Sequence, residues 1–501
     1  MDCRRPIVVS AFLLCIILPL SPFLFNGAPY IGDAWIHLRI AEETQASGRY
    51  RLSTYNERWP LVNLLLTFLM EVPGLNPLYA SQAIPFLAGL AVLPLYCLCR
   101  RLGLSEGAST AAILFLTFNP LYSYVTFAGA VMKETGAYYL IASMLLAAAL
   151  TLKGPRSPLA LTSLIGLGVV LGHHFGALTT LIFLSTLAFH SLLQSLKGER
   201  LSFKNALSTF IAFSIAFSIW NINSYLALKR DFSFIKAEDA ALLPALIILS
   251  AYSLHADRGL FSAGKPWLAA LSFIMAIAGL RGGVYALLQP IPPISLWEAG
   301  NYALAGALSL FGLAYALKKA FLKAYASASI GLSLFAFLWG LTPMGFTLLI
   351  KSLHYLGVLL ALGAGFSIQK LVERRLIGKA LASALILYTI YVSTFGTILA
   401  LNGLGAYHAG EVQSAFTLGR FIEGMRIYGD TRVGYLLPYA SNVSVQGLKP
   451  SRGGGPLILF KPNWEQGFLL GYDWAPKNFI IADEESSWNK LWDSPYLRVY
   501  A

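Results

Sequence analysis

Long apolar runs dominate this chain and restrict what it can fold into. Many stretches of the 501-residue sequence approach the about 17 to 25 apolar residues that a helix needs to cross a bilayer. Only 12% of the residues are charged and 56% are hydrophobic, whereas a soluble domain carries about 25% charged residues. This composition excludes a disordered chain, a collagen and an ordinary cytosolic enzyme. It predicts an all-α polytopic membrane protein.

The apolar runs predict about 13 transmembrane helices. We place them near residues 6–25, 79–99, 108–124, 135–152, 159–172, 175–192, 206–226, 240–255, 267–288, 301–317, 325–341, 346–368 and 380–401. The run 60–70 is too short to cross, so we predict a helix that lies on the membrane surface there.

The basic residues are concentrated on one side of these spans. Segments between alternate spans carry 18 basic and five acidic residues, whereas the opposite short loops carry eight and ten. Because short cytoplasmic loops are enriched in Lys and Arg, this pattern predicts a cell-membrane protein with a cytoplasmic N-terminus and an extracytoplasmic C-terminus. The net charge of +13 is therefore a consequence of topology and does not indicate a nucleic-acid partner.

The composition changes near residue 402. We predict a transmembrane domain over 1–402, with a first outer loop at 27–78, and a small extracytoplasmic α/β domain over 403–501. Within the latter, residue periodicity predicts a helix at 411–425 and strands at 426–430, 433–437, 457–460, 479–482 and 497–500.

The first outer loop contains polar residues that suit chemistry. Asp33 and His37 are four residues apart, hence on one face of a helix, where they form a candidate general base or metal site. The alternative is that Asp33 caps this helix. In the second outer loop, Glu134 is the single acid, beside Lys133. It is either a partner of Asp33 or one half of a membrane-edge pair that stabilises the next helix.

Further polar side chains lie in or beside the outer ends of predicted spans. Cations at this depth suit a phosphate or pyrophosphate on a lipid head group, whereas the alternative for the histidines is an ordinary place at the membrane interface. The candidate donor-phosphate contacts are His173, His174, Arg281, Lys351 and His354. Arg281 and Lys351 lie well inside spans and have no acid at helical spacing, which favours a functional role.

The segment Asp33-Ala-Trp-Ile-His37-Leu-Arg39 resembles the first acidic motif of the archaeal-type catalytic subunit of oligosaccharyltransferase, a GT-C membrane glycosyltransferase. The resemblance implies that Asp33 helps to hold a divalent cation, Mg²⁺ or Mn²⁺, or activates the acceptor, and that Arg39 contacts substrate. His37 and Glu134 are then further candidate ligands. Ser295-Leu-Trp297-Glu298 is similar to a later motif of that family, which implies substrate contacts for Trp297 and Glu298; the alternative is a proline-rich turn that ends in a helix cap.

The sequence also departs from that family. The second loop has one acid instead of two, and the Trp-Trp-Asp-Tyr-Gly block is missing, since Gly471-Tyr-Asp-Trp474 is similar only in composition. Recognition of a peptide sequon is therefore unsupported, and the acceptor, whether protein, lipid or glycan, is open. The chain contains no Walker loop and no G-x-G-x-x-G motif, which indicates that no nucleotide is used.

Three functions follow from these observations. The first is a glycosyltransferase that moves a sugar or glycan from a polyprenyl-(pyro)phosphate donor to an acceptor on the outer face. The second is a secondary transporter, although the two halves of the chain show no matching interrupted spans. The third is a non-catalytic membrane assembly protein that keeps the GT-C layout, for which the single acid in the second loop is the best support.

Overall fold

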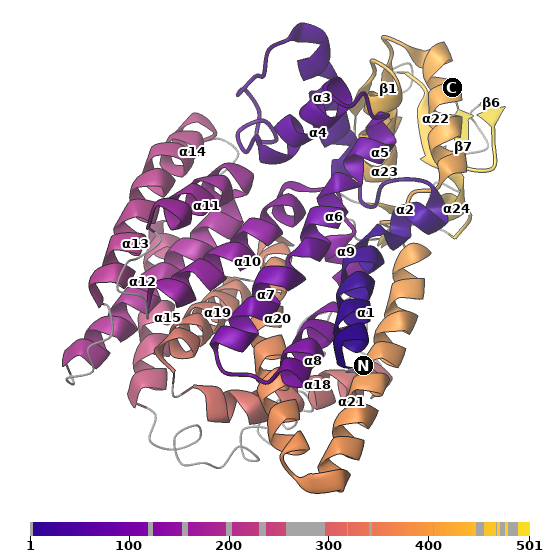
Figure 1. The fold of residues 1–501 in the computed structure, drawn as a ribbon. Coiled ribbons are helices and arrows are strands. Elements are labelled where there is room, and N and C mark those ends of the chain that lie inside the picture. The colour runs from indigo at the N-terminus through magenta and orange to yellow at the C-terminus, as the bar shows by residue number, and fades with distance from the viewer. Residues whose placement is uncertain are drawn as a thin grey trace. The chain divides into compact units, whose positions relative to one another are not determined.

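A computed structural model describes residues 4–118, 124–152, 159–196, 203–229, 237–256, 296–317, 319–339, 343–403, 405–446, 455–466, 468–470, 476–478 and 489–500. Helices form most of this part of the chain (Figure 1). The chain divides into two compact units, each assembled from segments that are distant in the sequence. Unit 1 comprises Met1–Pro19, Phe86–Ala128 and Lys133–Ile398, and unit 2 comprises Leu20–Pro85, Gly129–Met132 and Leu399–Ala501.

The regular elements in the described residues of unit 1 are all helices. Its helices are α1 (Arg4–Ile17), α7 (Val92–Arg101), α8 (Glu106–Thr117), α9 (Tyr124–Ala128), α10 (Lys133–Thr151), α11 (Leu159–Gly172), α12 (His174–Leu196), α13 (Phe203–Phe217), the π-helical turn η2 (Ser218–Ile222), α14 (Asn223–Ala227), α15 (Ala237–Ala256), α18 (Leu296–Ala316), α19 (Ala320–Trp339), α20 (Pro343–Val372) and α21 (Arg375–Leu401).

Seven helical segments in the described residues are long and apolar enough to cross a membrane. They are Pro6–Asn26, Pro77–Arg101, Lys133–Thr151, His174–Leu196, Phe203–Ala227, His354–Val372 and Leu376–Leu401. Five shorter apolar helices accompany them, and four of these coincide with predicted spans. The predicted total of about 13 stays a prediction, and the predicted span 267–288 lies outside the described residues.

Glycines allow two of the long helices to approach closely. A Cβ on Gly312 of α18 would clash with the carbonyl oxygen of Gly363 in α20, and a Cβ on Gly363 would clash with the carbonyl oxygen of Ser309. Small residues let backbones meet in this way inside a membrane, where packing and not the hydrophobic effect drives helix association. α20 is thereby fixed, and α20 carries Lys351 and His354.

Unit 2 combines short helices with a sheet. Its elements are η1 (Leu18–Leu20) and α6 (Ala83–Leu90), both at its boundary with unit 1, then α2 (Ser21–Asn26), α3 (Asp33–Ser47), α4 (Leu61–Glu71), α5 (Pro77–Ser81), α22 (Ala409–Ile422), β1 (Arg426–Gly429), α23 (Thr431–Ala440), β2 (Ser444–Gln446), β3 (Leu457–Phe460), α24 (Lys461–Glu465), β4 (Phe468–Leu470), β5 (Pro476–Asn478), β6 (Lys490–Asp493) and β7 (Leu497–Tyr500). The run 60–70 is thus helical, as predicted.

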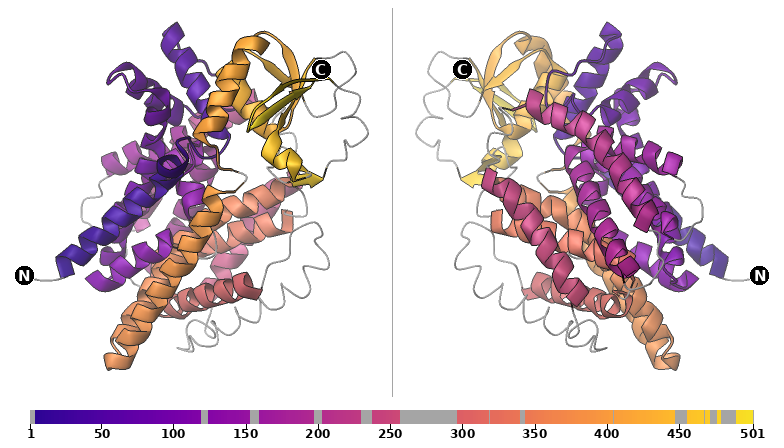
Figure 2. Two further views of the ribbon diagram at one scale, coloured as in Figure 1. Left: turned by 90° about the vertical axis from the view of Figure 1, so that its right-hand side faces the viewer. Right: turned by 90° about the vertical axis from the view of Figure 1, so that its left-hand side faces the viewer.

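The sheet of unit 2 has five strands in the order β2-β1-β3-β7-β6, with β1 parallel to both neighbours and β7 antiparallel to both of its own. Residues alternate between its faces along β3. Ile458 and Phe460 pack with α22 and α23, and Leu457 and Leu459 pack on the other side. Figure 2 shows α22 beside this sheet. The first-loop helices α3 and α4 join the same core as α22 and α23.

The predicted helix at 411–425 and the strands at 426–430, 457–460 and 497–500 are confirmed. The predicted strand at 433–437 is wrong, because these residues belong to α23. The Asp430 carboxylate caps this helix by accepting a hydrogen bond from the Val433 amide at 3.0 Å. Burial then follows the helical spacing Val433, Leu436, Leu437. The strand predicted at 479–482 lies outside the described residues.

Candidate functional site

The segment before Asp33 is held by backbone pairing within unit 2. Tyr30 forms a parallel bridge with Ala130 and an antiparallel bridge with Ala406. The Ile31 amide donates to the carbonyl of Gly405 at 2.9 Å. Ile31 has a φ of +70°, which is a strained conformation for a β-branched residue. This turn directs the chain into α3, whose first residue is Asp33.

The carboxylate of Asp33 is half-buried at the start of α3. It does not cap the helix through its side chain, so the expectation of a simple N-cap is not met. Among the described residues, no hydrogen bond or ion pair to this carboxylate is found. An anionic group near a helix N-terminus is favoured by the helix dipole, so Asp33 stays available as an acceptor of a proton or of a cation.

His37 is fully buried on the same helix and contacts α4. Its Nδ1 lies 2.7 Å from the side-chain oxygen of Asn63. The Asn63 amide in turn donates to the hydroxyl of Tyr50 at 2.8 Å and to the carbonyl of Asn56 at 2.9 Å. His37 thus links α3 to α4. Arg39 points to the surface and pairs with Glu43 at 3.2 Å, with both side chains about half exposed.

In unit 1, two helices that are distant in the sequence bring opposite charges together. The ammonium of Lys351 lies 3.5 Å from one carboxylate oxygen of Glu134, and Nδ1 of His354 lies 3.6 Å from the other. Glu134 and His354 are buried, whereas the Lys351 side chain is 30% exposed. We call Glu134, Lys351 and His354 the charged triad. It presents one accessible cation that a buried carboxylate holds in place.

Aromatic side chains fix the triad on one side. The imidazole of His354 stacks on the ring of Phe127 with centroids 3.9 Å apart, and Phe127 meets Tyr138 edge-on at 4.9 Å. The hydroxyl of Thr135 donates to the carbonyl of Phe127 at 2.8 Å, which connects Phe127 to the first turn of α10. Stacking and burial together restrict the imidazole to one orientation.

Further basic side chains lie near the triad. His174 is close enough to Lys351 and Lys133 to experience the positive charge of both. The rings of His173 and His174 are 4.6 Å apart, and the amide of Gly176 donates to Nδ1 of His173 at 3.2 Å at the start of α12. The structure therefore brings together four predicted residues, Glu134, Lys351, His354 and His174, and adds Lys133.

The surroundings of Glu134 do not fit a divalent cation. The Lys351 ammonium lies 3.5 Å from one of its oxygens and the His354 imidazole lies 3.6 Å from the other, and the positive charge of Lys351 would repel a metal ion at this distance. A hard cation also needs several oxygen ligands, and no group of three His, Cys, Asp or Glu side chains that could hold a metal is found in the described residues. We therefore derive no step through a metal held by Glu134.

Several predicted residues cannot be placed. Arg281 lies outside the described residues, as does the segment Gly471–Trp474. Trp297 and Glu298 lie in the first turn of α18, but their side chains are outside the described part of the structure. Phe127, which the sequence did not single out, proves to be the stacking partner of His354. Its place in the second loop, a few residues before Glu134, is the only sequence signal that points to it.

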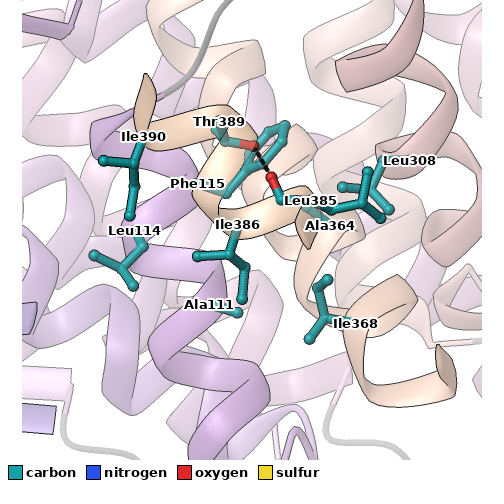
Figure 3. A pocket seen from close by; sticks show the side chains of 10 residues that line it. All are labelled: Ala111, Leu114, Phe115, Leu308, Ala364, Ile368, Leu385, Ile386, Thr389 and Ile390. Carbon is teal, nitrogen blue, oxygen red and sulfur yellow. Dashed lines mark hydrogen bonds between the residues drawn. The ribbon is translucent and has the colours of Figure 1, made fainter. Parts of the chain in front are cut away.

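A small pocket elsewhere in unit 1 is unsuited to a charged ligand. Figure 3 shows its lining side chains, which are apolar except for that of Thr389, whose hydroxyl bonds to the carbonyl of Leu385 at 2.7 Å. The lining residues are Ala111, Leu114, Phe115, Leu308, Ala364, Ile368, Leu385, Ile386, Thr389 and Ile390. A phosphate would lose its hydration there without gaining a partner, so the charged triad remains the better candidate.

No protein-family model and no curated protein sequence matches this chain. Solved structures of the oligosaccharyltransferase from Archaeoglobus fulgidus do match it in fold. The complex of the AglB protein with an inhibitory peptide and a dolichol-phosphate is 12% identical, with a TM-score of 0.56 over 100% of this chain and 76% of that one. The apo form of the same enzyme is also 12% identical. Its TM-score is 0.55, and the match covers 90% of this chain and 65% of that one.

A third structure, the complex of this enzyme with Zn and sulfate, is 13% identical with a TM-score of 0.51, and the match covers 91% of this chain and 68% of that one. Identities this low establish the fold alone. They agree with the resemblance that the Asp33 motif indicates. The chain therefore has the GT-C fold, in the form found in archaeal oligosaccharyltransferase.

Proposed function

We propose that this protein is an integral membrane glycosyltransferase. It takes a sugar or glycan from a polyprenyl-(pyro)phosphate carrier and passes it to an acceptor on the extracytoplasmic face. The fold supports the enzyme class, and a structure of the same fold holds a dolichol-phosphate and a peptide. The acceptor of this chain, whether protein, lipid or glycan, is not specified by that likeness.

The charged triad is the observation that carries this proposal. A polyprenyl-phosphate presents an anionic head group at the membrane surface, and its recognition requires a cation near the end of a span. Lys351 supplies this cation, because part of its side chain is exposed while Glu134 fixes its direction. His354 and His174 lie beside it and add hydrogen-bonding capacity.

The chemistry follows from the charge that develops on the donor. The acceptor attacks the anomeric carbon, the bond from this carbon to the phosphate oxygen breaks, and its electron pair stays on the departing phosphate. Lys351 stabilises this growing negative charge, as preorganised cations do in other transferases. Inversion at the anomeric carbon is an expectation from the family resemblance.

Asp33 is the proposed general base. Its carboxylate is half-buried and without a described partner, so it can accept the proton that the acceptor loses. A base with this role contributes about 10²- to 10⁴-fold to the rate. Arg39 faces solvent and pairs with Glu43, which leaves it as a proposed contact to the outer part of a substrate.

The test is a transfer assay with purified protein and a lipid-linked sugar extract. Asp33→Asn should lower the turnover number by about 100-fold or more while the melting temperature stays that of the parent. Glu71→Gln is the matched control, because Glu71 is an exposed carboxylate of the same loop and should leave turnover unchanged. If Asp33→Asn turns over like the parent, Asp33 is not the base.

The same preparation separates the other two functions. Uptake of a lipid-linked sugar into vesicles without transfer would favour a secondary transporter. Binding of the lipid without transfer or transport would favour a non-catalytic assembly protein. The proposal requires a new glycosidic product that depends on both the donor lipid and Asp33.

A further inference from the structure

A buried ion pair lies at the centre of unit 2. Arg432 of α23 donates from Nε to one carboxylate oxygen of Glu411 at 2.7 Å and from Nη2 to the other at 2.6 Å. Arg432 is 2% exposed and Glu411 is 1% exposed. Burial raises the pKa of Glu411, and the guanidinium counteracts this rise. A pair this deeply buried is costly to desolvate. We therefore looked for further contacts of the guanidinium.

The guanidinium also has a hydrogen-bond partner outside the ion pair. Its Nη2 also donates to the carbonyl oxygen of Ala406 at 2.6 Å. The rings of Tyr407 and Phe460 lie on it with centroids 4.4 and 4.1 Å from Cζ, which fixes the plane of the fork. Because the planar guanidinium presents several donors at once, it can bind Glu411 and Ala406 together, whereas a lysine ammonium lacks this geometry.

Ala406 pairs with the first outer loop just before Asp33. It forms the antiparallel bridge with Tyr30, and the neighbouring Gly405 accepts the amide hydrogen of Ile31 at 2.9 Å. Burial raises the pKa of Tyr30 to about 12, and the charge of Arg432 opposes this rise. The guanidinium is therefore near the phenol as well as bound to the backbone that pairs with it.

The strained turn at Ile31 needs such support. A φ of +70° at a β-branched residue persists only where neighbouring contacts hold it. The contacts that hold it include the bridges of Tyr30 with Ala130 and Ala406 and the hydrogen bond from the Ile31 amide to Gly405. Asp33 follows Ile31 by two residues, so the direction of its carboxylate depends on this turn.

A second route connects the same residues. Tyr407, which lies on the guanidinium, also packs edge-on against Trp35 of α3 with centroids 5.4 Å apart. Trp35 further contacts the ring of Tyr439 in α23 at 5.2 Å. The hydroxyl of Tyr439 donates to Glu42 of α3 at 3.2 Å. The first turns of α3 therefore rest on side chains that surround the ion pair.

We infer that Arg432 is a positioning residue for Asp33, and that through Arg432 the C-terminal domain orders the start of the first outer loop. This inference rests on the proposed role of Asp33. Arg432 acts through the Ala406 carbonyl and the Tyr30–Ile31 backbone, and Glu411 holds the guanidinium in the orientation that reaches Ala406.

The test separates positioning from stability with a double variant. Arg432→Met combined with Glu411→Leu removes both charges and fills their space with apolar atoms, a change that buried ion pairs often tolerate without loss of stability. It also removes the hydrogen bond to Ala406. We expect a melting temperature near that of the parent, a turnover number lower by about tenfold or more, and an unchanged KM for the donor. The single variant Arg432→Lys should keep a turnover number between those of the double variant and the parent.

Hydrogen exchange provides a readout that does not depend on activity. The amides of residues 28–36 should exchange about tenfold faster in the double variant, because the Ile31 amide loses its fixed acceptor. Gly405→Ala should give the same result without touching the ion pair, since its Cβ would lie 3.1 Å from the ring of Tyr30. Arg498→Met is the control, because the described partners of Arg498 are Glu465, Asp493 and Tyr500.

The outcomes are distinguishable. Unchanged exchange at 28–36 in a folded double variant overturns the inference, whatever the activity. Faster exchange with parental turnover shows that Arg432 orders the loop but that Asp33 is not the base, which contradicts the proposed function. Unchanged exchange together with parental turnover in the double variant shows that the pair only stabilises the domain, and this also overturns the inference.

Discussion

The ammonium of Lys351 lies 3.5 Å from the carboxylate of Glu134, across two helices that the sequence separates widely. A lysine inside an apolar helix is costly unless it has a partner or a function. Here it has a partner on one side and an exposed surface on the other. This combination supports the proposed role of Lys351 as the contact for an anionic head group.

Replacement of Lys351 tests this assignment. Lys351→Met should lower kcat/KM for the lipid-linked donor by about 100-fold, since one preorganised group that stabilises transition-state charge is worth about that much. Lys351→Arg should retain part of the activity. Lys370→Met is the control, because Lys370 forms an exposed pair with Glu373 at 2.7 Å. Equal kinetics for Lys351→Met and the control would contradict the assignment.

Metal supplementation tests the surroundings of Glu134. Glu134→Gln should lose activity, because Lys351 and His354 lose the anion that orders them. The ratio of variant to parental activity should be the same in EDTA, in Mg²⁺ and in Mn²⁺, because the Lys351 ammonium 3.5 Å from the carboxylate repels a metal ion. Recovery of the variant at raised metal concentration would instead identify Glu134 as a metal ligand.

A double-mutant cycle tests the role of His37. His37→Phe and Asn63→Leu should each lower the free energy of unfolding by about 1 to 3 kcal/mol, because each leaves a buried polar partner without its hydrogen bond. The double variant should lose less than the sum of the two. A metal ligand would behave differently: His37→Phe would then change the metal dependence of transfer, and Asn63→Leu would not.

The first loop should loosen in acid through Glu57. Burial would raise the pKa of this carboxyl, but hydrogen bonds from the amide and hydroxyl of Ser53 and the amide of Thr54, at 2.6 to 2.8 Å, lower it overall below its usual 4.5. A depressed pKa contributes stability above pH 4.5, and this contribution is lost as the pH falls through the lowered value. The protection factors of the amides at residues 50–58 should therefore fall as the pH drops through this lowered pKa, and Glu57→Gln should show the reduced protection already at pH 7.

Much of the fold could be read from residue patterns. Apolar runs indicated the helices, and alternating or helical spacing indicated α22, β1, β3 and β7. The error at 433–437 has a physical cause. Val433, Leu436 and Leu437 form a short apolar run that suits either a strand or a helix, and the Asp430 cap favours the helix.

The candidate site was predicted as separate residues and not as an arrangement. Glu134, Lys351 and His354 were each singled out because polar groups near a bilayer are costly, yet no local spacing links residue 134 to residue 351. Their ion pairs depend on the packing of α10 and α20. No local spacing links Arg432 to Glu411 either. Each residue alone resembles an ordinary charged position of an amphipathic helix.

The two bridges of Tyr30 have a consequence for how the chain is made. One partner, Ala130, is synthesised about a hundred residues later, and the other, Ala406, later still. Domains generally fold as they leave the ribosome, beginning at the N-terminus. The turn before Asp33 is an exception, because Tyr30 is translated well before both of its bridge partners. Until residue 406 has been added, the nascent protein carries its acidic motif without the backbone pairing that gives the motif its shape.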